Sequence, residues 1–142
     1  LSAVNLEEFG ADGRLRFGLQ AVTARENPAT GIVDLAVVTL DYHAPTGRTW
    51  HLTSTEARLP RTGATVEFEG DVRLSGTPDG RSEKAELHTQ VMSFDTEAER
   101  AQTDSPVDLA LGRHLVQARG MRVDLKAGNL SLEADVSGVF TP

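Results

Sequence analysis

The sequence predicts an all-β protein, and two observations support that prediction. Turn-forming clusters recur at short intervals along the 142 residues, at 10–13, 27–28, 45–47, 61–63, 78–80, 112 and 127–129. The segments between them have the length of strands and alternate apolar with polar residues, as in a sheet with one covered face. A chain of this length supports one domain, so we expect residues 1–142 to form a single sandwich or barrel-like domain.

The strands can be placed in order from this alternation. In the first clear strand, Leu15, Phe17, Leu19 and Ala21 share one face, and Arg14, Arg16 and Gln20 share the other. Three later strands have the apolar sets Ala85, Leu87, Thr89 and Val91, then Val107, Leu109 and Leu111, then Leu130, Leu132, Ala134 and Val136. Successive side chains of a strand point to opposite faces, so each apolar set is expected to face the interior.

Residues 40–54 predict a β-hairpin that turns at Thr46–Gly47. This register pairs Tyr42 with Leu52 and Ala44 with Trp50. It gives an apolar face of Leu40, Tyr42, Trp50, Leu52 and Ser54, and a polar face of Asp41, His43, His51 and Thr53. The hairpin is therefore expected to have one buried and one wet side.

The helix signal is weak throughout. Residues 95–102 carry four charges and no apolar stripe, so a polar turn is expected there. A loose repeat of strand, short turn and strand recurs about every 35 residues. Stacked hairpins that bury one another's apolar faces would explain such a repeat.

Composition excludes several classes of protein. The formal charge of −7, from 14 basic against 21 acidic residues, argues against a nucleic-acid partner. The absence of cysteine excludes disulfides, iron–sulfur clusters and cysteine nucleophiles. No run of 18 apolar residues is present, so no membrane-spanning segment is expected within the sequence.

No catalytic or metal-binding motif stands out. His43, His51 and Asp41 share a predicted face and are possible zinc ligands, but no fourth ligand follows at a fixed spacing. We therefore expect an exposed histidine pair without a metal. The carboxylate pairs Glu7/Glu8 and Glu97/Glu99 lie in segments expected to be exposed, which argues against glycosidase chemistry. Neither a Gly-x-Ser-x-Gly nor a nucleotide-binding glycine loop occurs, so no catalytic residue and no cofactor are expected.

The apolar interior leaves two interpretations open. Side chains such as Phe17, Trp50 and Phe68 are most simply an ordinary core. Sheets that wrap without closing also form cavities, and a cavity with this lining would suit a lipid or acyl chain.

Many short motifs, in order, resemble the LptC family of lipopolysaccharide export proteins. They begin with Asp12-Gly13 and the alternating strand 15–21, and continue with Tyr42, Trp50-His51-Leu52, Ala57 and residues 66–74. Leu87-His88-Thr89, Phe94-Asp95, residues 103–107, residues 120–125 and residues 130–138 complete the series. Residues 68–95 also resemble the wider OstA-like repeat shared with LptA and the N-terminal part of LptD. The Trp50 strand and Thr103-Asp104-Ser105-Pro106-Val107 favour LptC.

This resemblance implies a twisted, incompletely closed antiparallel β-jelly roll in the periplasm of a Gram-negative cell. Its apolar groove would hold the acyl chains of lipopolysaccharide and relay the lipid from the LptB/LptF/LptG transporter to LptA. The family has an N-terminal membrane helix, which would tether the domain to the inner membrane and which we expect to precede this chain. No enzymatic activity is implied. Two alternatives stay open: an LptA-type bridge protein, and a solid jelly roll that serves only as an assembly scaffold.

The resemblance and strand parity together suggest site residues. The expected lipid-contacting set is Phe17, Leu19, Leu35, Leu40, Trp50, Leu52, Phe68, Leu87, Val91, Leu109, Met121 and Leu132. The expected partner-binding set is Val4, Leu6, Phe9, Gly112, Leu130, Ala134, Val136 and Phe140. The N-terminal strand is expected to meet LptF/LptG at one open edge and the C-terminal strand LptA at the other, by strand addition. Gly13 and Gly112 are expected to need the conformational freedom of glycine.

Overall fold

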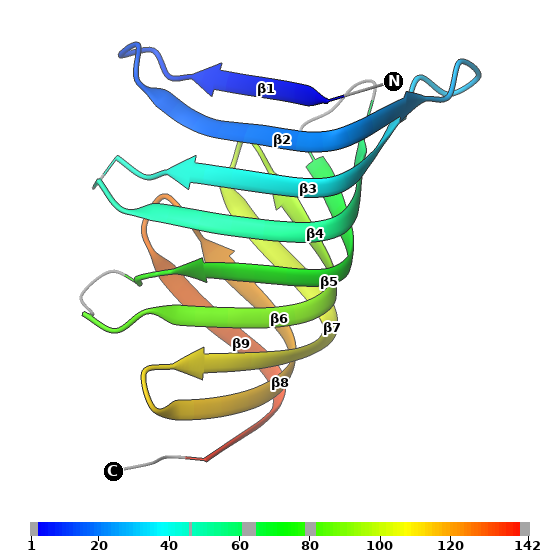
Figure 1. Ribbon diagram of the computed structural model, residues 1–142. Helices are drawn as coiled ribbons and strands as arrows, with labels where there is room; N and C mark the ends of the chain where they lie inside the picture. Colours follow the sequence, from blue (N-terminus) through cyan, green and yellow to red (C-terminus); the bar gives the residue numbers. More distant parts are fainter. Residues whose placement is uncertain (1–2, 46, 61–64, 79–81, 140–142) are drawn as a thin grey trace.

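The computed structural model describes residues 3–45, 47–60, 65–78 and 82–139. Nine antiparallel strands form one sheet, and each strand is paired with its neighbours in sequence (Figure 1). They are β1 (Val4–Phe9), β2 (Leu15–Glu26), β3 (Val33–His43), β4 (Thr49–Leu59), β5 (Thr65–Gly76), β6 (Ala85–Asp95), β7 (Arg100–Leu111), β8 (His114–Asp124) and β9 (Asn129–Val139). The all-β prediction is confirmed.

The sheet is coiled but not closed. Its two outer strands, β1 and β9, are the first and the last in the sheet order, and within the described residues they make no contact with each other. The expected placement of the two chain ends at opposite open edges is therefore confirmed.

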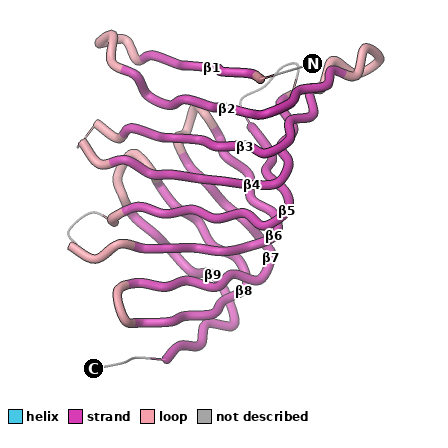
Figure 2. The backbone as a smooth tube through the Cα atoms, viewed as in Figure 1, coloured by secondary structure: helices cyan, strands magenta, loops and turns pink. Residues whose placement is uncertain are grey.

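Connections between strands are short loops and turns (Figure 2). The polar turn expected over residues 95–102 is shorter in the structure, where it covers residues 96–99, because Asp95 ends β6 and β7 begins at Arg100. No helix within the described ranges is long and apolar enough to cross a membrane.

The long strands bend near their middles, and the bends wrap the sheet around its apolar face. On β2 the alternation of buried and exposed side chains breaks at Val22–Thr23, where two consecutive residues are exposed. The same step occurs at Thr55–Glu56 on β4 and at Gln90–Val91 on β6. The steps on β4 and β6 lie at or beside shifts in register between neighbouring strands, which are β-bulges, whereas the β2–β3 register does not change at Val22. Register shifts occur in every successive strand pair from β4–β5 to β8–β9, and the sheet bends so that its two halves face each other (Figure 1).

The β3–β4 hairpin has the predicted faces but a different register. Tyr42 pairs with Trp50 and Leu40 with Leu52, so the predicted pairing of Tyr42 with Leu52 was wrong by two residues. A slip of two residues keeps every side chain on its face, which explains why the burial prediction still holds. The predicted turn residue Thr46 lies outside the described residues.

The core is one continuous apolar cluster between the two halves of the sheet. Phe68, Val72, Met92, Met121 and Val123 have 0% exposure. The Phe17 ring on β2 meets the Phe94 ring on β6 edge to face, with 5.7 Å between centroids. Since β2 and β6 are not neighbours in the sheet order, this contact crosses the interior.

Candidate functional site

The candidate site is the apolar interior between the two halves of the sheet. Of the residues expected to face it, ten are buried: Phe17, Leu19, Leu35, Leu40, Trp50, Leu52, Phe68, Leu87, Leu109 and Met121. Leu132 is partly buried and packs against the same cluster. The alternation of side chains along each strand was therefore enough to predict the inward position of most of these residues.

Val91 is the exception, and its predicted inward position was wrong. Its side chain is 43% exposed on the outer face, because the bulge after Thr89 inverts the alternation. Met92 and Phe94 take the inward positions on the rest of β6, and parity carried over from Leu87 had missed both. The sequence did contain a sign of this change. In Thr89-Gln90-Val91-Met92 two apolar residues, Val91 and Met92, follow each other, so the apolar positions change from odd to even residue numbers.

The interior opens beside the free edge strand β1. A cavity of about 150 Å³ lies there, lined by Leu6, Glu8, Phe17, Leu19, Leu40, Leu59, Pro60, Val66, Phe68, Phe94 and Thr96. Four of the expected lipid-contacting residues line it: Phe17, Leu19, Leu40 and Phe68. Leu6 and Leu59 lie at its rim, since both are only partly covered. This opening is a route into the interior that does not require a broken strand pairing.

An ion pair joins the two halves next to this opening. The Arg16 guanidinium on β2 contacts Glu99 Oε1 in the β6–β7 turn at 2.8 Å through Nη2 and at 2.9 Å through Nε. Arg16 also donates to the Thr96 carbonyl at 3.0 Å and lies 3.4 Å from Glu8 on β1. These contacts close the end of the interior across the sheet.

Glu99 was expected to be exposed with Glu97, and for Glu99 that expectation was wrong. Glu97 is exposed, but Glu99 has only 8% exposure. Its backbone is left-handed, with φ of 56°, a conformation that is uncommon for residues other than glycine. The polar turn sequence gave no sign of this, because the partner Arg16 lies 83 positions away.

The Arg16–Glu99 pair also sets the electrostatics of the buried end. Its hydrogen bond to Glu99 raises the pKa of Arg16, which keeps the guanidinium charged. Burial, with the nearby charge of Glu99, raises the pKa of the Tyr42 hydroxyl. Tyr42 is therefore neutral at physiological pH and packs against Phe94 at 6.2 Å between centroids.

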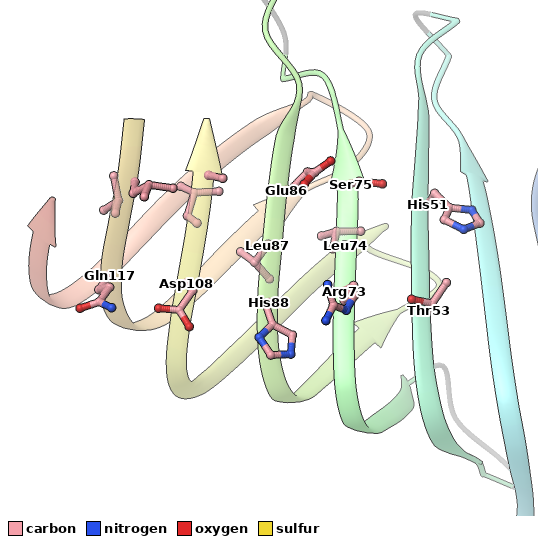
Figure 3. Close-up of a pocket in the computed structure, with 14 residues that line it drawn as sticks. His51, Thr53, Arg73, Leu74, Ser75, Glu86, Leu87, His88, Asp108 and Gln117 are labelled. Atoms are coloured by element: carbon pink, nitrogen blue, oxygen red, sulfur yellow. The ribbon is translucent and has the colours of Figure 1, made fainter. Parts of the chain in front are cut away.

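A groove lined by polar and apolar residues runs across β4 to β8 on the outer face (Figure 3). It has a volume of about 540 Å³ and is lined by side chains that include His51, Arg73, His88, Asp108 and Gln117. His88 Nε2 lies 2.7 Å from Asp71 Oδ1, and this hydrogen bond lowers the pKa of Asp71. Leu87 and Leu109, two of the residues expected to contact lipid, also line this groove.

The histidine pair considered as a zinc site is divided in the structure. His51 Nδ1 contacts Asp41 Oδ1 at 2.5 Å, whereas His43 lies 3.4 Å from the Thr49 hydroxyl. Within the described part of the chain, no group of three or more metal-ligating side chains is close enough to hold an ion.

The expected partner-binding residues lie at or near the two sheet edges. Val4 is half-buried and Leu6 and Phe9 are exposed on β1, and Leu130 is half-buried on β9. Ala134 and Val136 belong to β9, while Phe140 lies outside the described residues. Gly112 lies in the β7–β8 turn with φ of 59°, and Gly13 has φ of 80°, so both need a left-handed backbone.

Comparisons with known proteins agree with this architecture. A family model described as "Lipopolysaccharide-assembly, LptC-related" matches residues 1–141. Among solved structures, LptH, the LptA homologous periplasmic component of the conserved lipopolysaccharide transport device from Pseudomonas aeruginosa, is similar with a TM-score of 0.66. It has 12% sequence identity, and the match covers 89% of this chain and 95% of that chain, which establishes a shared fold. Comparison with curated protein sequences found no match.

Proposed function

Because this chain belongs to the LptC-related family of lipopolysaccharide-assembly proteins, we propose that it carries lipopolysaccharide across the periplasm. The lipid's acyl chains would lie between the two halves of the sheet, with its sugars and phosphates outside. The proposal assigns the protein no catalytic step, no cofactor and no metal. The observation that best supports this proposal is the apolar cavity that opens beside β1 and leads to the buried cluster.

The size of that opening indicates how loading proceeds. A cavity of about 150 Å³ is smaller than the roughly 300–1,000 Å³ typical of small-ligand pockets. Several acyl chains therefore enter only if the halves of the sheet part, beginning at the free edge of β1. Each methylene buried contributes about 0.8 kcal/mol, so a few chains compensate for the separation of apolar side chains.

The two open edges support a relay between neighbours. Among the strands of the described residues, none pairs with the outer side of β1 or β9, and such edges pair readily with a strand of another protein. We assign the β1 edge to LptF/LptG with LptB, and the β9 edge to LptA. A membrane helix preceding β1 would keep that edge near the inner membrane.

One observation favours the scaffold alternative. Away from the opening the interior is closely packed, with side chains such as Met92 and Met121 wholly buried. A solid domain that only bridges its neighbours would look the same. The two functions differ in whether lipid ever reaches the interior.

Photo-crosslinking distinguishes them. A photoreactive amino acid at Leu6 or Leu59, on the rim of the cavity, should capture lipopolysaccharide in cells that are exporting it. The same probe at His51, an exposed polar position on the outer face of β4, is the matched control and should capture none. Equal labelling at all three positions, or labelling at none while the partners still bind, would contradict the carrier function.

A further inference from the structure

A second pocket lies at one end of the sheet, outside the apolar interior. It has a volume of about 690 Å³ and is built by the β1–β2 and β3–β4 turns, with Glu99 and Lys126 from two later turns. The β1–β2 and β3–β4 turns lie at the same end of the sheet (Figure 1). The pocket adjoins the interior, because Arg16 and Glu99 of the closing ion pair form part of its wall.

The pocket collects positive charge on a protein whose net charge is −7. Arg14, Arg16 and Lys126 line it together with His43, against the two carboxylates of Asp12 and Glu99. Glu99 is neutralised by Arg16, and Asp12 Oδ1 accepts the backbone N–H of Arg14 at 3.0 Å within its turn. Three cationic side chains against two carboxylates leave the pocket lining with one formal positive charge, since Arg14 and Lys126 together outweigh Asp12.

These two cations differ from several other basic side chains of the molecule. Arg58, Arg73, Lys84 and Arg122 each lie within 3.6 Å of a carboxylate. Among the described residues, neither Arg14 nor Lys126 has a carboxylate within 4.0 Å of its charged nitrogens. Both side chains are exposed, so they are available to an anion from solution.

The remaining lining is apolar. Leu15, Ala44 and Pro45 form part of it, and Ala44 also belongs to the buried cluster of the interior. An anion bound between Arg14 and Lys126 would thus have an apolar surface beside it that continues toward the core. That combination fits the anionic end of an amphiphile better than it fits a fully hydrated ion.

We propose that this pocket is a subsite for a phosphate group of an amphiphile, held by Arg14 and Lys126. The inference rests on the proposed function, because it gives the phosphates of lipopolysaccharide a place while the acyl chains occupy the interior. Phosphate is preferred to a single carboxylate, since a phosphate monoester carries about −1.5 to −2 charge at neutral pH and has three acceptor oxygens for charge-assisted hydrogen bonds.

The test compares lipopolysaccharide with its chemically dephosphorylated form, using the intact domain. Wild type should bind the phosphorylated form about tenfold more tightly, as expected for one or two charge-assisted contacts. In the double variant Arg14→Gln/Lys126→Gln that preference should disappear while affinity for the dephosphorylated form is unchanged. The double variant Arg58→Gln/Lys84→Gln removes the same charge from the outer face and should keep the preference.

A second experiment uses inorganic pyrophosphate as a probe without a lipid part. If it alone shifts the side-chain NMR signals of Arg14 and Lys126, while wild type binds both lipopolysaccharides equally, the pocket takes free phosphate and the amphiphile proposal is wrong. A preference retained by Arg14→Gln/Lys126→Gln would also overturn the subsite, yet leave the carrier function intact. If wild type binds neither lipid form, the carrier function and the amphiphile subsite fail together.

Discussion

Arg16 and Glu99 lie 2.8 Å apart although β3, β4 and β5 lie between β2, which carries Arg16, and β6, which precedes the turn that carries Glu99. Their contact helps to fix the curvature of the open sheet, because it joins the two halves across the interior, as the Phe17–Phe94 ring contact also does. The side chains have 28% and 10% exposure, so the pair is largely withdrawn from water. A pair of this kind specifies one closed arrangement of the two halves, because either charge alone is unfavourable there.

Arg16→Gln should destabilise the fold by about 2 kcal/mol, below the 3–5 kcal/mol of a fully buried pair because Arg16 is partly exposed. Glu99→Gln should cost less, since Arg16 keeps the Thr96 carbonyl and Glu8 as partners. Denaturant unfolding of both single variants and the double variant measures the coupling. Arg58→Gln, which breaks an exposed pair with Asp34, should change stability by under about 0.5 kcal/mol. Equal effects of Arg16→Gln and Arg58→Gln would contradict the role given to Arg16–Glu99.

Gly76→Ala should destabilise the protein by about 1–3 kcal/mol through overpacking. A Cβ at Gly76 would lie 2.5 Å from the Trp50 ring, which is itself buried, so the ring or the backbone would have to shift. Gly18→Ala is the control, because a Cβ there meets nothing within 4 Å. Thermal unfolding of the two variants should differ clearly, and a stable Gly76→Ala would mean that Trp50 shifts freely.

Val37→Asn should raise stability by about 0.5–1 kcal/mol. Val37 has φ of 55° and is 60% exposed, so a β-branched side chain is held in a left-handed backbone without burial to compensate. Asparagine adopts this conformation more readily. Val22→Asn, on the neighbouring strand with 57% exposure, should bring no such gain. A loss of stability in the Val37 variant alone would show that Val37 makes contacts that its exposure does not reveal.

The sequence predicted the strands and most inward residues because parity is a local property. Phe17, Leu19 and Leu40 follow from alternation within single strands, and their burial does not depend on how the strands are stacked. Val91 and Met92 were misplaced because a bulge inverts the alternation partway along a strand, and one residue decides the phase of all that follow. The Arg16–Glu99 pair could not be inferred at all, since it depends on how far the completed sheet curves.

Stability should fall below about pH 4 partly because of Asp71. Its hydrogen bond to His88 lowers the pKa of Asp71 in the folded state relative to the unfolded value of about 3.9. A carboxyl group with a depressed folded pKa adds stability above the unfolded pKa, and that contribution is lost as the pH falls through the folded pKa. Asp71→Asn and His88→Gln should both flatten the pH dependence of unfolding between pH 5 and pH 2 by similar amounts. An unchanged profile in Asp71→Asn would remove Asp71 from the explanation of acid sensitivity.

The final prediction concerns the β9 edge as the docking site for LptA. In an antiparallel edge strand, successive backbone N–H groups point alternately toward the paired strand and toward the open side. Single proline substitutions at residues 131–135 should therefore alternate in effect. Those that remove an outward N–H should weaken LptA binding with little loss of stability, and those that remove an N–H bonded to β8 should mainly destabilise the domain.

Glu133→Ala is the matched control for that scan, because it removes the 2.7 Å contact with Arg122 but leaves the backbone donor in place. It should bind LptA as wild type does, whereas the proline variants with outward-facing positions should bind several-fold more weakly. Binding to LptF/LptG should be unaffected throughout, because that contact is assigned to β1 at the other edge. If the outward proline variants bind LptA normally while Glu133→Ala does not, side chains rather than strand addition make the interface.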